Sequence, residues 1–451
     1  MIAEFVGVPA GPLAPELFPL DHTIHLQMNS RHMKNTAIVL SAAVIACAES
    51  KAPAPESAVR DSAGVEIVES GVQEWTPATA WYLDTAAFQV IGETDGIDQK
   101  PLDPVSVFRT AAGEIVVADG NQVGWHSLLI YDTHGKWLRT LGRKGQGPCE
   151  FQQVWWATPY PGDSVAVFDM GRQLVHILGL DGTCSGSVRV PRQLEGAQQR
   201  RGGFVSEAYA VYPDGSFLMA PMGWLGTADE GPNSFRHELI RINRDGDVRN
   251  VLGEFEIGSI YWNGRMSQQL FYGPFASRTL DGYDLVYGTG RSYELQRFNS
   301  TGKLIQIMRR TTEPQRVTRR DQERAVTREY VGGGGERRVS TVRPRTVAQR
   351  IEDGHWADTK PFYRSVRVDA SGYIWVEDYR LESLGFQVAD ATPASWSVFS
   401  PGGTWLGSVT MPALFHVRSI YDDVVFGIWQ DEDGVRSVRV YRLRRRDYGS
   451  D

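Results

Sequence analysis

Arginine residues, together with one Trp-His pair, follow several short apolar stretches of the sequence at comparable positions. The candidates are Trp125, His126, Arg172, Arg291 and Arg380. Guanidinium groups brought onto one face bind carboxylates or phosphates through paired hydrogen bonds. One hypothesis is therefore a binding face for an anionic ligand. The alternative is that each arginine pairs with an acidic neighbour, such as Asp169 or Asp378, and only joins adjacent parts of the fold.

The nine histidines show no spacing that would suit a metal ion, so the sequence predicts no metal site and no cofactor. His416 lies in a stretch that we expect to border the central channel of the fold, and it is the best single candidate for a channel ligand. His176 lies within an apolar strand and is interpreted as a structural residue.

No nucleophile elbow, zinc-protease, phosphate-loop, EF-hand or Cys-x-x-Cys motif occurs in the sequence. Calcium requires six to eight oxygen ligands, and the stretches expected to border the channel contain one acidic residue, Glu207. This pattern favours a non-catalytic protein. A hydrolase or lyase sited in the channel, with or without a metal, is kept as the alternative.

Apart from Cys47, the sequence contains two cysteines, Cys149 and Cys184. We expect them on opposite faces of the fold and predict two isolated thiols. Pairing in an oxidising compartment is the alternative.

The segment 33–50 reads MKNTAIVLSAAVIACAES. Lys34 precedes an apolar run over 36–46, which is too short for a membrane-spanning helix but suits the core of a signal peptide. Residues 44–47 resemble a bacterial lipobox, which implies a lipid on Cys47. We therefore predict a lipid anchor in the bacterial cell envelope, at the outer membrane or the periplasmic face, with simple secretion as the alternative. Residues 1–46 form an upstream extension with the signal peptide, and the Pro-, Ala- and Ser-rich residues 47–64 form a flexible tether.

A repeated unit of four short strands positions these residues. Its most apolar strand occurs six times, at residues 114–119, 164–169, 216–220, 284–287, 373–377 and 423–426. A turn containing Gly or Asp precedes each one, because these residues tolerate the positive φ of tight turns. Four-stranded units repeated in this way predict an all-β fold, a six-bladed β-propeller of four-stranded blades over residues 65–445. Residues 446–451 are a tail.

The sixth unit ends before a fourth strand of its own. Residues 88–92 resemble the fourth strands of other units, and we predict that they supply the missing strand. Such a strand would join the first and last units and leave no open edge.

One insertion, at residues 311–360, departs from the strand pattern. Arg and Glu recur there at helical spacing, which predicts one or two surface helices. Residues 311–350 contain ten Arg and five acidic residues. This basic segment is either a solvated cap or a docking surface for a partner.

Residues 129–151, which read LIYDTHGKWLRTLGRKGQGPCEF, resemble the blade signature of NHL-like bacterial six-bladed propellers of unknown function. Cys149 replaces a glycine of that signature. The resemblance implies the propeller fold and names no ligand, since propellers carry many unrelated functions.

The chain of 451 residues has a formal net charge of −7, so an overall basic surface for nucleic acid is excluded. The sequence therefore predicts a binding or scaffold protein of the cell envelope. Its predicted partner is a protein, peptide or glycan, recognised through one face of the ring.

Overall fold

The computed structural model describes residues 57–92, 102–120, 126–190, 206–221, 229–327, 346–380, 392–431 and 435–445. All of them belong to the unit of residues 53–451. The predicted signal peptide, Cys47, Trp125 and the tail over 446–451 lie outside the described residues. Within the described ranges, no helix is long and apolar enough to cross a membrane.

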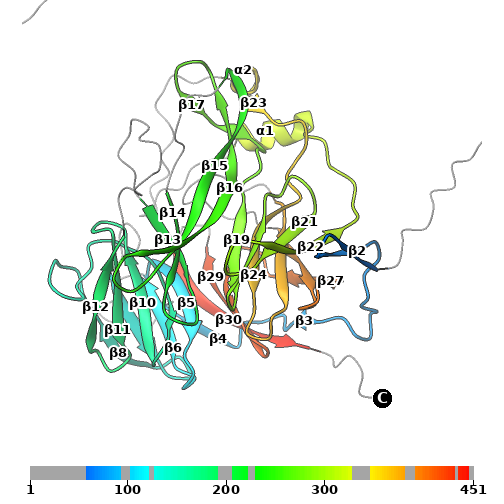
Figure 1. The fold of residues 1–451 in the computed structure, drawn as a ribbon. Helices are drawn as coiled ribbons and strands as arrows, with labels where there is room; N and C mark the ends of the chain where they lie inside the picture. Colours follow the sequence, from blue (N-terminus) through cyan, green and yellow to red (C-terminus); the bar gives the residue numbers. More distant parts are fainter. Residues whose placement is uncertain are drawn as a thin grey trace, which may run out of the picture. The chain divides into compact units, whose positions relative to one another are not determined.

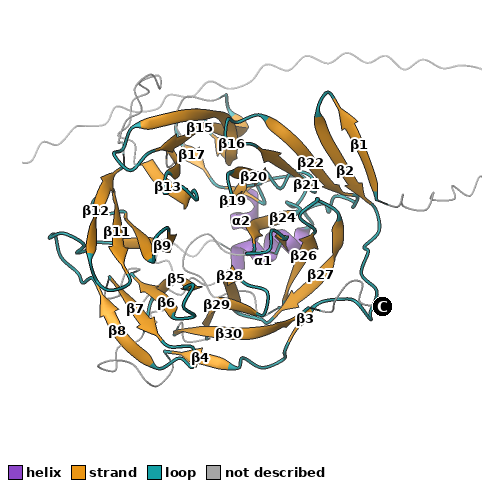
Figure 2. Cartoon of the chain, turned by 60° about the horizontal axis from the view of Figure 1, so that its bottom comes forward, coloured by secondary structure: helices purple, strands orange, loops and turns teal. Residues whose placement is uncertain are grey.

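All described strands but β18 and β23, which pair separately, form six sheets of four to six strands, almost wholly antiparallel, arranged around a ring (Figure 2). The first sheet contains β5 (Pro104–Arg109), β6 (Ile115–Asp119), β7 (Ser127–Tyr131) and β8 (Trp137–Leu141). The second contains β9 (Val154–Tyr160), β10 (Ser164–Asp169), β11 (Leu174–Gly179) and β12 (Cys184–Arg189). The third contains β13 (Ser206–Val211), β14 (Phe217–Pro221), β15 (Gly231–Ile242), β16 (Val248–Trp262) and β17 (Ser267–Gln268).

The other three sheets follow in chain order. The fourth contains β19 (Ser277–Asp281), β20 (Asp284–Gly288), β21 (Glu294–Phe298) and β22 (Leu304–Arg310), extended by β1 (Ala58–Ser62) and β2 (Val65–Ser70). The fifth contains β24 (Tyr363–Val368), β25 (Ile374–Asp378), β26 (Ala394–Phe399) and β27 (Trp405–Met411). The sixth contains β28 (Phe415–Ile420), β29 (Val424–Gln430) and β30 (Arg436–Arg444), with β3 (Tyr82–Leu83) and β4 (Gln89–Ile91) paired to β30.

The second strand of each sheet is the apolar stretch that the sequence singled out. It is buried along most of its length because it lies between two other strands and packs against neighbouring sheets on both faces. Val116 of β6 and Val167 of β10, for example, belong to one core between the first and second sheets. Gly113, with φ of 88°, makes the turn into β6 in a conformation that favours glycine. A ring of such sheets is the arrangement of a β-propeller.

The first strand of each sheet lies nearest the middle of the ring (Figure 2). These six strands contact one another in a closed circuit. The contacts are Ser106 Oγ accepting from the Ala157 amide, Trp156 Nε1 donating to Ala208 O, Arg278 stacking over Tyr209, Ser277 Oγ accepting from the Val366 amide, Arg367 Nη1 donating to Arg418 O, and Ser419 Oγ donating to Val107 O. The circuit therefore returns from the sixth sheet to the first.

The N-terminal strap, residues 65–91, crosses three consecutive sheets. It begins with β2, which pairs in parallel with β22 of the fourth sheet. Trp75 and Trp81 are then buried in a core that contains Trp375 of the fifth sheet. The strap ends with β4, which pairs with β30 of the sixth sheet. This pairing confirms that residues 88–92 provide an outer strand for the last sheet, whereas the parallel pairing of β2 was not predicted.

A cap made of residues 259–272, 315–327 and 346–360 lies above the sheets in Figure 1. It contains α1 (Arg319–Thr327), α2 (Val347–Glu352), β17 and the parallel pair of β18 (Leu270–Phe271) with β23 (His355–Trp356). Tyr272 Oη donates to Asp321 O at 2.9 Å, and Lys360 pairs with the Asp321 carboxylate at 2.7 Å. The helices confirm the helical prediction for the insertion at 311–360.

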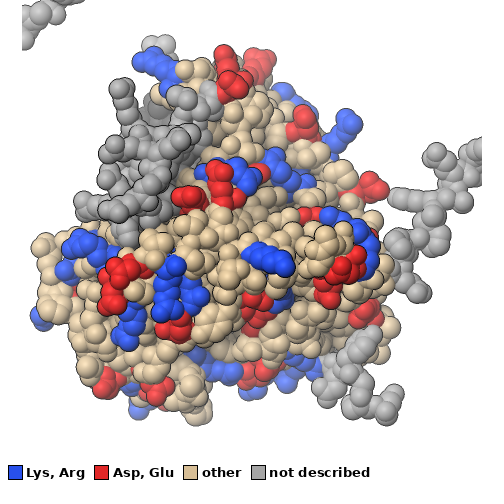
Figure 3. Space-filling view, viewed as in Figure 1, with Lys and Arg blue, Asp and Glu red and all other residues tan. Residues whose placement is uncertain are grey.

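Acidic and basic side chains are mixed on the face shown in Figure 3, cap included. Arg319, for example, pairs with Glu323 one turn along α1, at 3.5 Å. Docking of a partner on the Arg-rich insertion stays a prediction.

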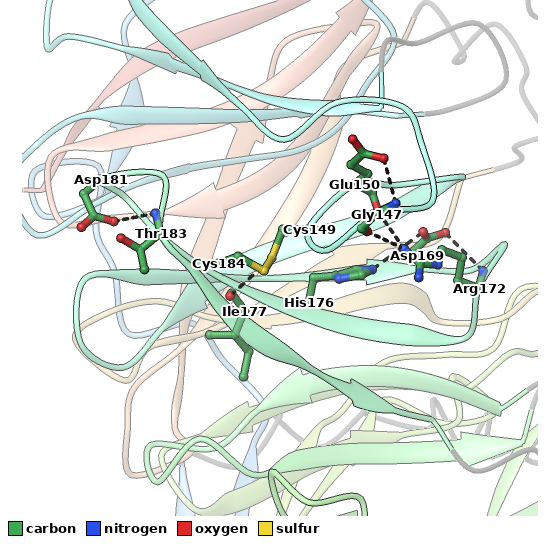
Figure 4. The surroundings of a disulfide bond; sticks show 10 residues. All are labelled: Gly147, Cys149, Glu150, Asp169, Arg172, His176, Ile177, Asp181, Thr183 and Cys184. Atoms are coloured by element: carbon green, nitrogen blue, oxygen red, sulfur yellow. Dashed lines mark hydrogen bonds and ion pairs between the residues drawn. A yellow bond between two sulfur atoms is a disulfide. The ribbon is translucent and has the colours of Figure 1, made fainter.

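Cys149 and Cys184 form a disulfide, with their Cα atoms 5.8 Å apart (Figure 4), so the prediction of two isolated thiols was wrong. The loop between the first and second sheets does not stay on one face of the ring. It runs across the second sheet, where Phe151 is buried against the His176 ring at 5.4 Å between centroids. Cys149 is thereby placed beside Ile177 O of β11, next to the start of β12, where Cys184 lies.

Candidate binding site on the inner strands

A β-bulge recurs in the first strand of five of the six sheets. In each case one residue is skipped in the pairing between the first and second strands. The skipped residues are Val105, Trp155, Tyr209, Arg364 and Arg418. A bulge leaves its extra residue outside the ladder and re-aims the side chain. The skipped residue is the second residue of β5, β9 and β24 and the fourth residue of β13 and β28, so the bulges fall at two different places in the first strand.

These five residues and Arg278 form what we call the inner ring. Arg278 lies on the first strand of the fourth sheet, which has no bulge. All six side chains are half-buried although their strands are the innermost ones. Each therefore keeps part of its surface accessible, although Val105, Trp155 and Tyr209 also pack against cores between sheets. Their types divide the ring into two arcs, with aromatic residues on the second and third sheets and arginines on the fourth, fifth and sixth.

Buried Glu377 on β25 orients two arginines. Its carboxylate accepts from Arg364 Nε at 3.0 Å and from Arg380 Nε at 3.2 Å. Arg380 is a residue that the sequence proposed for the binding face. The structure thus places Arg380 directly beside the inner ring, joined to Arg364 through one carboxylate.

Two further contacts hold the cationic arc in place. Arg367 Nη1 donates to Arg418 O at 2.9 Å and so fixes the bulged backbone of the sixth sheet. Burial lowers the pKa of Arg367 from its ordinary value. The guanidinium of Arg278 stacks over Tyr209 at 3.4 Å from the ring centroid, a cation–π geometry that joins the cationic arc to the aromatic arc.

His416 lies on β28, two residues before the bulged Arg418. Burial, followed by the positive charges of Arg418, Arg364, Arg380 and Arg436, lowers the pKa of His416 to about 3. The charged groups with the largest effect on this histidine are therefore cationic, and Glu377 and Asp103 pair with three of them. The imidazole is neutral at physiological pH and reports a strongly positive environment.

The other predicted face residues are engaged locally. Arg172 Nη1 donates to Gly147 O at 3.0 Å and to Glu150 O at 3.1 Å, so it supports the loop between the first two sheets (Figure 4). Arg291 pairs with Glu256 at 2.6 Å. His126 is buried and its Nδ1 accepts from the Val154 amide at 3.4 Å.

Burial also lowers the pKa of His126, with the charge of Lys144 acting in the same direction. Among the described contacts, the structure brings Arg380 and His416 together and leaves Arg172, Arg291 and His126 in separate surroundings.

Sequence reasoning missed the inner ring itself. Trp155, Arg364 and Arg418 stood in the stretches assigned to first strands, but a strict period of two gives no reason to select them. The bulges also fall at different places in different first strands, so residue type at a fixed position gives no signal either. Glu207, the one acidic residue noted in those stretches, belongs to β13, and nothing is described of its side chain.

No protein-family model matches the chain, and no curated protein matches it. Solved structures similar in fold include three that illustrate the range of the matches. A member of the DUF4221 family from Bacteroides vulgatus has 11% identity and a TM-score of 0.47, over 81% of this chain and 99% of that one.

A catalytically inactive virginiamycin B lyase from Staphylococcus aureus with quinupristin has 12% identity and a TM-score of 0.38, over 79% of this chain and 98% of that one. A gluconolactonase from Xanthomonas campestris has 11% identity and a TM-score of 0.34, over 80% of this chain and 100% of that one. These similarities assign no function to this chain. In the part of the chain that the structure describes, no three His, Cys, Asp or Glu residues are grouped to hold a metal ion.

Proposed function

We propose that the chain is a six-bladed propeller of the NHL-like type, built on four-stranded blades, that binds an anionic ligand at the inner ring without catalysing a reaction. The six sheets and the closed circuit of contacts between their first strands support the number of blades. The extra strands on the fourth and sixth sheets come from the N-terminal segment, which precedes the repeats.

The observation that carries the proposal is the environment of His416. Four arginines, on β28, β24 and β30 and just after β25, lower its pKa, and Glu377 and Asp103 pair with three of them. Arginines held this close repel one another, and an anion placed among them relieves that repulsion. Guanidinium groups also offer the paired donors that carboxylates and phosphates accept.

The same histidine argues for binding rather than catalysis. A general base works best when its pKa lies near the operating pH. With a pKa of about 3, His416 holds a proton too weakly to serve as an acid–base catalyst near pH 7. The proposed role of His416 is instead to donate and accept hydrogen bonds through its neutral ring.

The proposed location is the cell envelope, with a lipid on Cys47 as the anchor and the following residues as a tether. The Cys149–Cys184 disulfide supports export, because disulfides persist in oxidising compartments. The ligand in this proposal belongs to a protein, a peptide or a glycan.

The test is isothermal titration of the mature protein, made without its signal sequence, with inorganic phosphate, citrate, poly-glutamate and oligogalacturonate. We expect at least one anion to bind, and at least tenfold weaker binding in the double variant Arg364→Gln/Arg418→Gln, since a charge-assisted hydrogen bond contributes about 1.5–3 kcal/mol. Arg60→Gln is the control, because Arg60 is exposed on the edge strand β1. Turnover of esters or lactones that His416→Ala abolishes would contradict the proposal.

A further inference from the structure

The Cys149–Cys184 disulfide joins one buried and one exposed residue. Cys149 is 7% exposed, in the loop between the first and second sheets, whereas Cys184 is exposed at the start of β12 (Figure 4). A thiolate breaks a disulfide by attacking one of its sulfur atoms, and access decides which sulfur it reaches. An external thiol therefore approaches this bond from the Cys184 side.

The strand that carries Cys184 leaves this side uncovered. β12 is the last strand of the second sheet, and no described strand pairs with its outer edge. The residues that follow Cys184 are small and exposed, namely Ser185, Gly186 and Ser187. A Cβ atom placed on Gly186 would have no atom of the described residues within 4 Å, apart from its chain neighbours. Cys184 is therefore open to a nucleophile as large as another protein, whose chain could also pair with the free edge of β12.

The loop around Cys149 is also held by contacts that do not involve sulfur. Phe151 is fully buried. Glu150 Oε2 accepts from the Gly147 amide at 2.8 Å, and Arg172 Nη1 donates to the carbonyl oxygens of Gly147 and Glu150. Loss of the sulfur–sulfur bond therefore leaves the loop attached to the second sheet.

The reduced form of Cys149 has a hydrogen-bond acceptor already in place. Its Sγ lies 3.9 Å from Ile177 O (Figure 4). A thiol donates a weak hydrogen bond, whereas a disulfide sulfur has no hydrogen to donate. The Cα atoms of Cys149 and Cys184 are 5.8 Å apart, within the range that a disulfide spans. Two thiols held at this separation are ready to form the bond again.

Reduction changes the backbone at Cys149 most. Its φ of 51° lies in the left-handed region, which is unfavourable for a residue with a Cβ atom. The bond to Cys184 holds the residue in that conformation. Once this bond is absent, the anchored neighbours Gly147 and Phe151 limit how far the loop moves. The reduced protein therefore differs from the oxidised one locally, at Cys149 and at the exposed start of β12.

We propose that Cys149 and Cys184 form a reversible thiol–disulfide couple, which exchanges with an external dithiol through Cys184 while the propeller stays folded. A thiolate of the dithiol bonds to Cys184 Sγ, the sulfur–sulfur bond breaks, and Cys149 leaves as a thiolate that takes a proton from water. The second thiol of the dithiol then displaces Cys184 as a thiolate, which is also protonated, and closes the reagent's own disulfide. An oxidised dithiol reverses both steps. This couple is independent of anion binding at the inner ring.

The experiment uses the mature protein with Cys47→Ser, which keeps Cys149 and Cys184 as its only cysteines. The protein is incubated with dithiothreitol at several urea concentrations below its unfolding transition. Free thiols are counted by alkylation and mass spectrometry after an acid quench. The rate of reduction should change by less than about twofold across this series, because exchange at an exposed sulfur needs no unfolding. Circular dichroism should show a folded reduced protein, and glutathione disulfide should restore the bond.

Two single variants show which sulfur is attacked. On the Cys47→Ser background, Cys149→Ser leaves the exposed thiol and Cys184→Ser leaves the buried one. Both variants lack the cross-link, so each is the matched control for the other, and a difference in rate reports the position of the thiol. With glutathione disulfide, Cys149→Ser should form a mixed disulfide at least about tenfold faster, because its thiol is exposed.

Three results would overturn the proposal. A rate of reduction that rises steeply with urea would show that exchange waits for the propeller to unfold. A reduced protein without native circular dichroism would exclude a couple that works in the folded state. Equal rates of mixed-disulfide formation in the two single variants would remove Cys184 as the point of attack.

Discussion

The guanidinium of Arg445 lies over the indole of Trp81, 4.4 Å from the ring centroid. Trp81 belongs to the N-terminal strap, and Arg445 follows the last strand of the sixth sheet. Arg445 also pairs with the buried Asp369, at 2.5 Å, and Asp369 accepts from Trp375 Nε1 at 2.9 Å. The two ends of the propeller are therefore joined to each other and to the fifth sheet through one cluster.

Replacement of Trp81 by alanine should weaken this closure strongly. Its side chain is 7% exposed and packs against Trp75 and Trp375. A buried Trp→Ala change costs about 3–5 kcal/mol of unfolding free energy. Guanidinium chloride unfolding, followed by circular dichroism, measures the loss. Trp137→Ala, at an exposed position, should change stability by less than about 1 kcal/mol. Equal losses in the two variants would refute a closing role for the strap.

The Cys149–Cys184 disulfide gives a second prediction. It closes a loop between residues 35 positions apart, for which the chain-entropy account gives about 3–4 kcal/mol of stabilisation. The double variant Cys149→Ala/Cys184→Ala should lower the unfolding free energy by that amount. A reducing agent should lower the stability of the parent protein and leave the double variant unchanged. Equal sensitivity of both proteins to the reductant would show that the effect lies elsewhere.

Local patterns were sufficient to predict the repeated elements. The apolar second strands, such as residues 164–169, can be recognised from their own residues and the turns before them. The closing strand at residues 88–92 can be recognised because it resembles the fourth strands of other units. The pairing of β2 with β22 could not be predicted in this way. It joins Glu66 to Gln306 in parallel, and no local pattern encodes a partner so distant in the sequence. The disulfide was mispredicted for a related reason, because the path of the loop before Phe151 depends on packing against the second sheet.

The candidate site was only partly predictable. His416 and Arg380 were selected from the sequence, and they do lie together beside the inner ring. Arg278 was missed because nothing in the sequence pattern singles it out on β19 (Ser277–Asp281). The bulges were missed because they interrupt the period of two on which strand prediction depends.

Stability should fall as the pH falls from about 6.5 toward 4, and the cause is the buried histidines. Burial lowers the pKa of His176 to about 4, although the Asp169 carboxylate, 3.9 Å from Nε2, acts in the opposite direction. An unfolded histidine titrates near 6.5. Between these values the unfolded chain takes up a proton that the folded protein does not, so protonation favours unfolding by up to about 1.4 kcal/mol per pH unit for this residue. His126 and His416 also have lowered pKa values and act with the same sign.

The variant His176→Gln tests this account, because it removes the titrating group while keeping a polar side chain of similar size. The unfolding free energy of the parent protein and the variant is measured in urea at half-unit steps from pH 5 to pH 8. Protonation of carboxylates with lowered pKa values, such as Glu69, reduces the unfolding free energy mainly below about pH 4.5, which lies outside the measured range of pH 5 to pH 8. The variant should show a shallower slope below pH 6.5 and the same slope above pH 7. His134→Gln, on an exposed turn, should leave the slope unchanged, and a matching change in both variants would remove His176 as the cause.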